Sequence, residues 1–379
     1  MLTRLLLQDF RSWQVLEAPF NAPIIAIAGE NGAGKTNLLE AISLLGPGRG
    51  LRGARMSEYG RRTDGQARSW AAAGRFQTPH GTYDIGTGAD PDGTSERRVF
   101  RLDGQPVRAQ ADLADRIAIV WLTPQMDRLF QESASGRRRF LDRLVWALEP
   151  THAREVAAHD NAMSQRNRLL AGGRADPAWL AGLEDAMARH AVAATAARRG
   201  LVARLNAVMA AGTATGAFPA ARMDLVCPIG AALAEQPALA VEDALRAALA
   251  EGRRRDAAAG GAARGAHRAD MALIHLPKDQ PAEMCSTGEQ KALLISTVLA
   301  HAALIAEARG FAPLLLLDEV AAHLDQARRE ALFAALVTLP AQSFLTGTDS
   351  EVFRPLQGIA DRFRATPGIL VPEAETGSR

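Results

Sequence analysis

The sequence is poor in cysteine and in long apolar runs, and each shortage excludes a class of protein. Its two cysteines, Cys227 and Cys285, are too few for a disulfide framework and lack the spacing of a zinc site. No apolar run approaches the ~18 residues of a membrane span. The first acid, Asp9, comes too early for a secretory signal. These features predict a globular protein of the reducing cytoplasm.

Charge of one sign and lysine are also scarce. The 379 residues carry a net charge of +2, so charge alone does not predict a nucleic-acid-binding protein. Only three of the 44 basic residues are lysine, and the others are arginine. A lysine kept in such a background hints that its position needs a compact ammonium group. The three lysines are Lys35, Lys278 and Lys291.

What the sequence does contain is a complete phosphate-binding loop. Residues 29–36 fit the pattern G-x-x-x-x-G-K-[ST], after an apolar run at 24–28 and before a helix-like run at 37–42. Its glycines let backbone N–H groups point at phosphate oxygens, and the helix directs its positive end at the same oxygens. We expect Lys35 to reach the β- and γ-phosphates and Thr36 to bind Mg²⁺.

The alternative, a glycine-rich turn without a ligand, leaves the strand and the helix beside the loop unexplained. We therefore predict binding of a nucleoside triphosphate by Gly29, Glu30, Asn31, Gly32, Ala33, Gly34, Lys35 and Thr36. Trp13 either stacks on adenine or packs behind the loop, and we favour packing.

Periodicity and turn residues predict the elements around this loop. We expect strands over 2–10, 14–18 and 24–28, a helix over 35–45, antiparallel strands over 69–77, 82–87 and 97–102, and a buried strand over 117–122. Residues 134–212 are helical in character, with long helices over 151–170 and 178–210. We then expect a strand over 222–227, a helix over 240–251, a mobile loop over 253–265 and a strand over 271–276. The last third returns to α/β, with a helix after 286–288, a strand over 314–317, a helix over 325–337, a strand over 343–346 and a frayed tail after about 368.

Two acids follow a run of four leucines, Leu314–Leu317. A buried strand that ends in a solvated turn explains the leucines but not the paired carboxylates. We expect Asp318 to hold Mg²⁺ and Glu319 to polarise the attacking water. Lys35 and Asp318 lie 283 positions apart, so a large insertion must leave the sheet, near Pro124-Gln125, and return near 270.

A second phosphate-directed segment, Ser286-Thr287-Gly288-Glu289-Gln290-Lys291, begins a helix. A serine and a glycine there offer a hydroxyl and bare N–H groups to an anion. Two such helix starts are hard to use on one nucleotide within one chain, whereas use across a dimer resolves the difficulty. The alternative is an ordinary capping box of Ser286 and Glu289.

These motifs together resemble the ABC-type ATPase heads of the SMC and DNA-repair class, most closely the RecF family of bacteria. The resemblance implies an α/β fold, an ABC-type ATPase head with a P-loop parallel sheet plus an antiparallel β subdomain, and an inserted, mostly helical second domain. It places the ATPase lobe at 1–130 and 266–379, and the inserted domain, an arm for dimer and DNA contacts, at 131–265. The matching segments are Leu5–Arg11, Gly29–Ile42, Gly136–Asp142, Gly265–Asp270, the signature motif Ser286–Lys291, and Asp318–Asp325, which looks like Walker B running into the D-loop.

By this resemblance further residues receive roles. The nucleotide-binding segment extends to Asn37, and Gln125 falls at the Q-loop, where it would sense Mg²⁺ and the attacking water. Ser286 and Gly288 would contact the partner's γ-phosphate, and Asp325 would lie at the dimer interface. Two segments depart from the family pattern. Glu132–Gly136 stands where members often carry a Gly-Ser-Pro-like turn, and Thr346-Gly347-Thr348 where transporter ATPases carry a switch histidine, so either threonine could sense the γ-phosphate.

The resemblance implies an ATP-dependent recombination mediator of DNA repair, replication and the SOS response. ATP and Mg²⁺ would drive dimerisation on duplex or gapped DNA, weak DNA-stimulated ATP hydrolysis would reset it, and RecR and RecO would help it to load the recombinase RecA. The main alternative is the ATPase subunit of a membrane ABC transporter, against which stand the missing switch histidine and the helical insertion. A phosphotransferase would leave the signature motif without a role.

Candidate contacts to DNA phosphates are arginines after the first helix and on the insertion, and for each the alternative is a solvated arginine. Such contacts give affinity without sequence choice. No interleaved aromatic platform for single strands is visible, which favours duplex or junction binding. The candidates are Arg49, Arg52, Arg55, Arg61, Arg62, Arg137 and Arg138.

Overall fold

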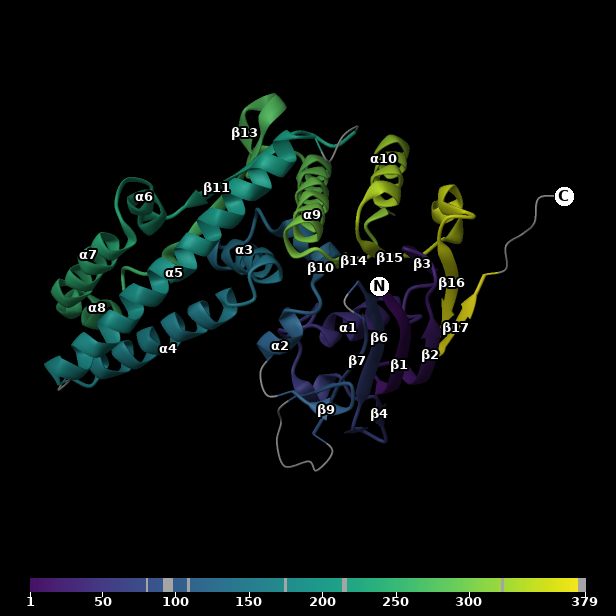
Figure 1. Ribbon diagram of the computed structural model, residues 1–379, viewed down its shortest axis with the longest axis horizontal. Coiled ribbons are helices and arrows are strands. Elements are labelled where there is room, and N and C mark those ends of the chain that lie inside the picture. Colours follow the sequence, from purple (N-terminus) through teal and green to yellow (C-terminus); the bar gives the residue numbers. More distant parts are fainter. Residues whose placement is uncertain are drawn as a thin grey trace. The chain divides into compact units, whose positions relative to one another are not determined.

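The chain divides into two units, shown in the computed structural model of Figure 1. The structure describes residues 1–79, 81–90, 98–107, 110–173, 176–212, 217–321 and 324–373. The first unit comprises 1–127, 212–219 and 294–379, and the second comprises 128–211 and 220–293.

A mostly parallel sheet carries the phosphate-binding loop of the first unit. Its strand order is β10-β14-β15-β3-β16-β17, parallel from β10 to β16 and antiparallel at β17. The strands β3, β14 and β15 are entirely buried, and β3 and β14 are wholly apolar, as expected of a sheet covered on both faces. The strands are β3 (Ile24–Ala28), β10 (Ile119–Leu122), β14 (Leu314–Leu317), β15 (Gln342–Gly347), β16 (Asp361–Thr366) and β17 (Ile369–Pro372).

A second six-stranded sheet of the first unit is antiparallel, in the order β2-β1-β6-β7-β8-β9. Helix α1 (Lys35–Leu45) contacts both sheets, and its buried side chains share one apolar core with them. The helix that leaves the phosphate-binding loop is therefore fixed by packing on both sides. The strands are β1 (Leu2–Phe10), β2 (Trp13–Pro19), β6 (Ala71–Thr78), β7 (Gly81–Gly88), β8 (Val99–Leu102) and β9 (Gln105–Pro106).

The second unit is mainly helical. Its two longest helices, α4 (His152–Ala171) and α5 (Pro177–Ala210), lie side by side (Figure 1). Asp176 caps α5 by accepting a hydrogen bond from the Ala178 N–H, and Pro177 occupies the first helical position. A sheet of β11 (Ala221–Val226), β12 (Asp270–His275) and β13 (Gln280–Pro281) completes the unit, with α3 (Ala134–Leu148), α6 (Pro228–Glu235), α7 (Ala238–Glu251), α8 (Arg253–Ala259) and the start of α9 (Thr287–Arg309).

The structure differs from the sequence-based expectation in several segments. Residues 253–259, expected in a mobile loop, form α8, and residues 369–372, expected in a frayed tail, form β17. The strand expected over 97–102 begins at Val99, since Arg98 lies outside the strand, and residue 97 lies outside the described residues. The two units also divide the chain at other points than the expected domain boundaries: residues 128–130 and 266–293 lie in the second unit, where β12 pairs with β11, and residues 212–219 lie in the first.

Helix α9 is long and apolar enough to cross a membrane by length and composition alone. However, 78% of its most apolar 18-residue window is buried within the protein, as in a core helix. It is the one helix of this kind among the described residues.

Candidate functional site

The phosphate-binding loop is shaped by two glycines in the left-handed region. Gly32 and Gly34 have φ of 87° and 94°, conformations that side chains with a Cβ rarely adopt. A Cβ on Gly34 would also lie 2.6 Å from Ser12 Oγ and 3.2 Å from the Trp13 ring. The loop therefore requires glycine at position 34 for two independent reasons.

Trp13 packs behind this loop. Its side chain is fully buried, and its indole Nε1–H donates to the Gly34 carbonyl at 3.3 Å. A buried ring has no face left for a base, so packing is the role that the geometry supports. Beside it, Asn37 donates to Ser12 Oγ at 3.0 Å, which ties the first turn of α1 to the β1–β2 turn.

Lys35 is almost completely buried within the loop. Its ammonium donates to the carbonyls of Gly29 at 2.7 Å and Glu30 at 3.1 Å, and lies 3.2 Å from Glu319 Oε1. Three oxygen atoms therefore surround the Lys35 ammonium. Phosphate oxygens are acceptors of the same kind, so a bound phosphate could replace them.

Asp318 follows β14 and meets two hydroxyl groups. Its Oδ1 accepts from Thr36 at 3.0 Å and from Thr346 at 2.8 Å. Burial raises the pKa of the Asp318 carboxyl above its ordinary value, although the hydrogen bonds from these threonines oppose the shift. Thr346 also accepts from the Glu319 N–H at 3.0 Å, so this threonine fixes both acids.

Lys35, Thr36, Asp318 and Glu319 line one pocket of about 440 Å³ in the first unit. The segments predicted to bind phosphate and Mg²⁺ come together there, although Thr36 and Asp318 are 282 positions apart in sequence. The lining consists of Asn31, Gly32, Gly34, Lys35, Thr36, Asn37, Arg52, Pro124, Gln125, Asp318, Glu319 and Thr348. Of the two threonines considered for γ-phosphate sensing, Thr348 reaches the pocket wall, whereas Thr346 is buried behind the acids.

Arg52 belongs to this wall, a position that sequence reasoning did not give it. It donates to Asn37 Oδ1 at 2.9 Å and to the buried Glu40 carboxylate at 3.2 Å, which Arg11 also binds with two hydrogen bonds. Glu40 lies one helical turn after Thr36 on α1. An acid at this position of the helix was the one feature of the sequence that could have indicated a basic partner such as Arg52. Arg52 is thus placed at the nucleotide pocket rather than free for DNA.

The signature segment belongs to the second unit, and its serine caps α9. Ser286 and Glu289 form the capping box that was the alternative interpretation: Ser286 Oγ accepts from the Glu289 N–H at 3.4 Å, and Glu289 Oε2 accepts from the Ser286 N–H and also from its hydroxyl. Asp325, in the first unit, caps α10 (Gln326–Thr338) by accepting from the Arg328 N–H. Residues 322 and 323 of the D-loop segment lie outside the described residues.

Several arginines considered for DNA are engaged within the chain. Arg137 makes two hydrogen bonds to Asp270, at 2.9 and 2.6 Å, and Arg138 donates to the Ala269 carbonyl at 2.9 Å. Arg61 pairs with Asp9 at 2.8 Å. The contacts of Arg137 and Arg138 hold α3 to β12, and so they join the segment Gly136–Asp142 to the segment Gly265–Asp270. Three candidates are exposed and make no ion pair with the described residues, namely Arg49, Arg55 and Arg62.

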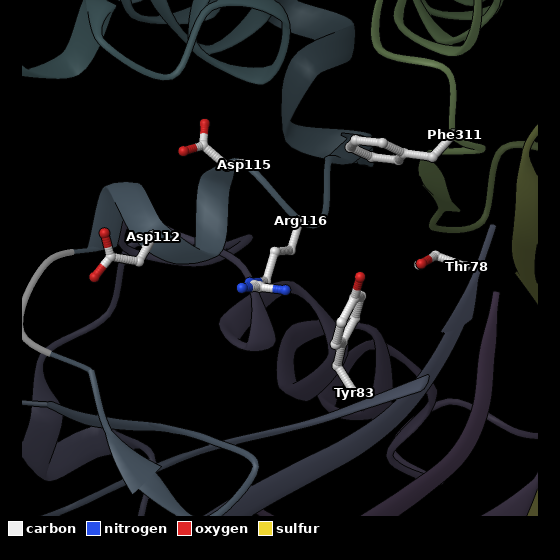
Figure 2. A pocket seen from close by; sticks show the side chains of 6 residues that line it. All are labelled: Thr78, Tyr83, Asp112, Asp115, Arg116 and Phe311. Atoms are coloured by element: carbon white, nitrogen blue, oxygen red, sulfur yellow. The ribbon is translucent and has the colours of Figure 1, made fainter. Parts of the chain in front are cut away.

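A further pocket of similar volume opens on the first unit, as Figure 2 shows. The Arg116 guanidinium lies over the Tyr83 ring, 4.8 Å from its centroid, while Asp112 and Asp115 provide carboxylates on the rim. Two carboxylates repel phosphate oxygens, and the pocket contains no phosphate-binding loop. It does not compete with the first pocket for a triphosphate.

Comparison with known proteins matches the chain almost from end to end. The family model "RecF/RecN/SMC N terminal domain" matches residues 1–366. "DNA replication and repair protein RecF" of Mesorhizobium japonicum is 45% identical over 372 residues, 98% of this chain and 97% of that protein. The protein of the same name from Agrobacterium fabrum is 44% identical over 367 residues, 97% of each chain.

Solved structures support the fold. The structure of "the recombination mediator protein RecF-ATPrS in RecFOR pathway" has a TM-score of 0.85 at 21% identity, covering 99% of this chain and 98% of that one. An Smc head domain from Pyrococcus furiosus has a TM-score of 0.54 at 16% identity, covering 98% and 96%. The expected ABC-type ATPase head and the expected resemblance are both confirmed, and the chain belongs to the RecF family.

Proposed function

We propose that the chain binds and hydrolyses ATP with Mg²⁺ in the 440 Å³ pocket. One observation carries the proposal: Lys35, Thr36, Asp318 and Glu319 converge there from segments far apart in sequence, within hydrogen-bond or ion-pair distance. Phosphoryl transfer needs positioned phosphates and stabilised charge more than covalent chemistry. The loop supplies the N–H groups, Lys35 the charge, and Glu319 an acceptor for the attacking water.

The donor set fits Mg²⁺. The Thr36 hydroxyl and the Asp318 carboxylate are hard oxygen ligands 3.0 Å apart, and Mg²⁺ commonly takes one or two protein oxygens with phosphate oxygens and water. Bound there, the ion neutralises charge that develops on the phosphates. Gln125 lines the same wall and would bind a ligand water of the ion. The raised pKa of Asp318 is consistent with a carboxylate that gains a cation on nucleotide binding.

Lys35 must change partners when the nucleotide binds. It now donates to two loop carbonyls and pairs with Glu319, and a γ-phosphate would take the place of these oxygens. Glu319 would then be free to face the attacking water. The pocket is therefore set up so that the nucleotide itself releases the carboxylate used in hydrolysis.

We further propose that ATP joins two copies of the chain on DNA. Ser286 and Gly288 of one copy would complete the nucleotide site of the other, with Asp325 at the interface, and the inserted domain, residues 131–265, would serve as the arm. The relatives' names, which refer to DNA replication and repair, support a role in DNA repair, and we propose that this role is that of a recombination mediator in the cytoplasm. It would act at gapped or duplex DNA with RecR and RecO to load RecA. None of the matched relatives cited above is named as a transporter subunit.

The test is gel filtration with and without ATP and a gapped duplex. The proposal expects ATP to promote both a dimer and a DNA complex; if ATP promotes neither, it should be abandoned. Lys35→Arg should retain some ATP binding but lose hydrolysis, since the longer planar group cannot place one compact charge between the phosphates. Normal turnover in that variant would remove Lys35 from the mechanism.

Ser286→Arg tests the site across the dimer. It should block ATP-dependent dimerisation and leave ATP binding by the monomer intact, because Ser286 would contact only the partner's nucleotide. An ATP-bound dimer of normal affinity would contradict the use of Ser286 across the interface.

A further inference from the structure

Lys278 is one of three lysines in an arginine-rich chain, and the proposed nucleotide pocket gives it no role. It ends a short turn between β12 and β13, its side chain is about half exposed (48%), and its ammonium lies 2.6 Å from Glu289 Oε1. This contact joins the turn to the signature helix α9 within the second unit.

The partner of Lys278 is the carboxylate that covers the signature serine. Glu289 Oε2 accepts from Ser286 N–H at 3.0 Å and from Ser286 Oγ at 2.9 Å, while Oε1 takes Lys278. Hydrogen bonding to Lys278, and then to the backbone and side chain of Ser286, lowers the pKa of Glu289 to about 2. Three donors therefore converge on one fully ionised carboxylate at all physiological pH values.

A capping box alone requires only Ser286 and Glu289. It gives no reason for a third donor from a different element, nor for a lysine where the chain elsewhere uses arginine. A compact ammonium suits an oxygen acceptor that is exchanged, because it does not impose the two-point geometry of a guanidinium.

We propose that Glu289 occupies, on Ser286 of the free chain, the place that the partner copy's γ-phosphate takes in the dimer, and that Lys278 then meets this phosphate. The inference rests on the proposed function, since it needs Ser286 to act across the dimer. Carboxylate and phosphate oxygens offer the same acceptor chemistry to these three donors, so the exchange leaves no donor unpaired. Glu289, 19% exposed, turns to solvent.

The two side chains should then have opposite effects on dimerisation. Lys278→Met removes the cation that meets the phosphate and should weaken the ATP-dependent dimer by about tenfold or more. Glu289→Gln keeps the cap but removes the competing charge, and should strengthen the dimer. Lys278→Arg should restore part of the affinity. A purely structural pair would weaken the dimer in both variants, so a loss in Glu289→Gln equal to that in Lys278→Met would overturn the proposal.

The matched control is Arg222→Met. Arg222 lies on β11 of the same small sheet, is exposed, and binds Asp224 at 3.0 Å, so it should not affect dimerisation. Dimer dissociation constants are measured by sedimentation with saturating ATP, and monomer affinity with a fluorescent ATP analogue at low protein concentration. Monomer affinity should be unchanged in all variants.

Mixing two variants shows whether Lys278 acts across the dimer. In a mixed dimer of Lys35→Arg and Lys278→Met chains, one composite site carries both changes and the other carries neither. ATPase activity of the mixture should exceed the mean of the two separate variants. If Lys278 acted within its own chain, no site would be intact, and activity at or below that mean would overturn the proposal.

The two levels of the argument fail separately. A wild-type chain that does not dimerise with ATP contradicts the proposed function. If the wild-type chain dimerises with ATP, and Lys278→Met dimerises as tightly as the control Arg222→Met, only the role of Lys278 is contradicted.

Discussion

Asp318 and the partly buried His267 each carry an electrostatic cost in the free protein. Asp318 is a buried carboxylate whose raised pKa reflects lost hydration. Glu319 adds a backbone φ of 53°, uncommon for a residue with a side chain. Strain and unfavourable charge concentrate at sites that a ligand later completes.

Asp318→Asn should separate stability from activity. The neutral amide removes the cost of the buried charge, so the variant should melt at the same temperature as the wild type or higher. ATP hydrolysis should fall by about 100-fold or more, because one ligand of the expected ion loses its charge. Calorimetry and a phosphate-release assay measure the two effects. Asp84→Asn, at an exposed carboxylate on β7, is the control, and a large loss of stability in Asp318→Asn would contradict this account.

His267 is the second case, and its cost depends on pH. Its Nε2 contacts the Ala262 carbonyl at 3.0 Å, and Nδ1 is buried without a partner. Burial lowers the pKa of His267, and the neighbouring His159, Arg268 and Arg138 lower it further. A folded-state pKa below the unfolded value near 6.5 means that the unfolded chain binds the proton first.

The free energy of unfolding should therefore fall as the pH drops from about 6.5 toward the lowered pKa of His267. Above pH 6.5 this residue should contribute no pH dependence. His267→Gln should flatten the decline in urea titrations at several pH values. His190→Gln, which alters a half-buried histidine bonded to Glu155, is the comparison, and an equal flattening there would remove His267 as the cause.

Among the helices and strands, α8 is stabilised by ion pairs with distant residues, although its composition does not predict a helix. Arg166 is fully buried and binds Glu184 of α5, Asp256 of α8 and the Leu249 carbonyl of α7, at 3.0, 2.9 and 2.7 Å. Arg253 adds two hydrogen bonds to Glu184. Two buried carboxylates are thus balanced by the buried guanidinium of Arg166 and the partly exposed one of Arg253.

Arg166→Leu should destabilise the second unit strongly. It leaves two buried carboxylates short of a partner, a change that typically costs about 3–5 kcal/mol. Urea unfolding followed by circular dichroism measures it. Arg246→Leu is the matched control, because its pairs with Asp185 and Asp243 are exposed and should cost at most about 1 kcal/mol. Similar losses in the two variants would contradict the special role of the buried network.

The same contrast explains which elements the sequence predicts. Helices α1 and α5 bury apolar side chains at helical spacing, and β14 is a run of four leucines, so local pattern was enough. The Arg/Ala/Gly segment of α8 has no apolar stripe, and its partner Arg166 lies 90 positions away. Strand β16 has arginine at alternate positions, and its partner strand β3 lies over 330 positions away in the sequence. No local pattern indicates this pairing.

The nucleotide site likewise has residues that the sequence predicts and residues that it does not. The loop residues and the two acids follow fixed spacings and were predictable. The support given by Thr346 and the placement of Arg52 through Glu40 depend on long-range hydrogen bonds. Those contacts arise only once β15 and α1 pack, so spacing could not reveal them.

For the whole molecule, a net charge of +2 cannot by itself hold a polyanion. Binding to DNA would depend on local arginines that the fold leaves free. Ion pairs and hydrogen bonds already use Arg52, Arg61, Arg137 and Arg138. Arg49, Arg55 and Arg62 are exposed in one segment after α1, so we expect the phosphate contacts there.

The triple variant Arg49→Gln, Arg55→Gln, Arg62→Gln should bind duplex DNA more weakly and with less salt dependence. Each lost phosphate contact should reduce the slope of log K against log salt by roughly 0.9, and the loss should not depend on DNA sequence. Fluorescence anisotropy over a series of salt concentrations measures the slope. ATP binding should be unchanged, because none of the three lines the nucleotide pocket.

Two comparisons make this prediction specific. Arg354→Gln removes a highly exposed arginine elsewhere on the first unit, 77% exposed, and should leave the slope unchanged. Arg137→Gln should lower the melting temperature by loosening α3 from Asp270, with an unchanged slope for the folded fraction. If Arg137→Gln reduced the slope and the triple variant did not, DNA would bind the helical unit, at the expense of the contact between α3 and β12.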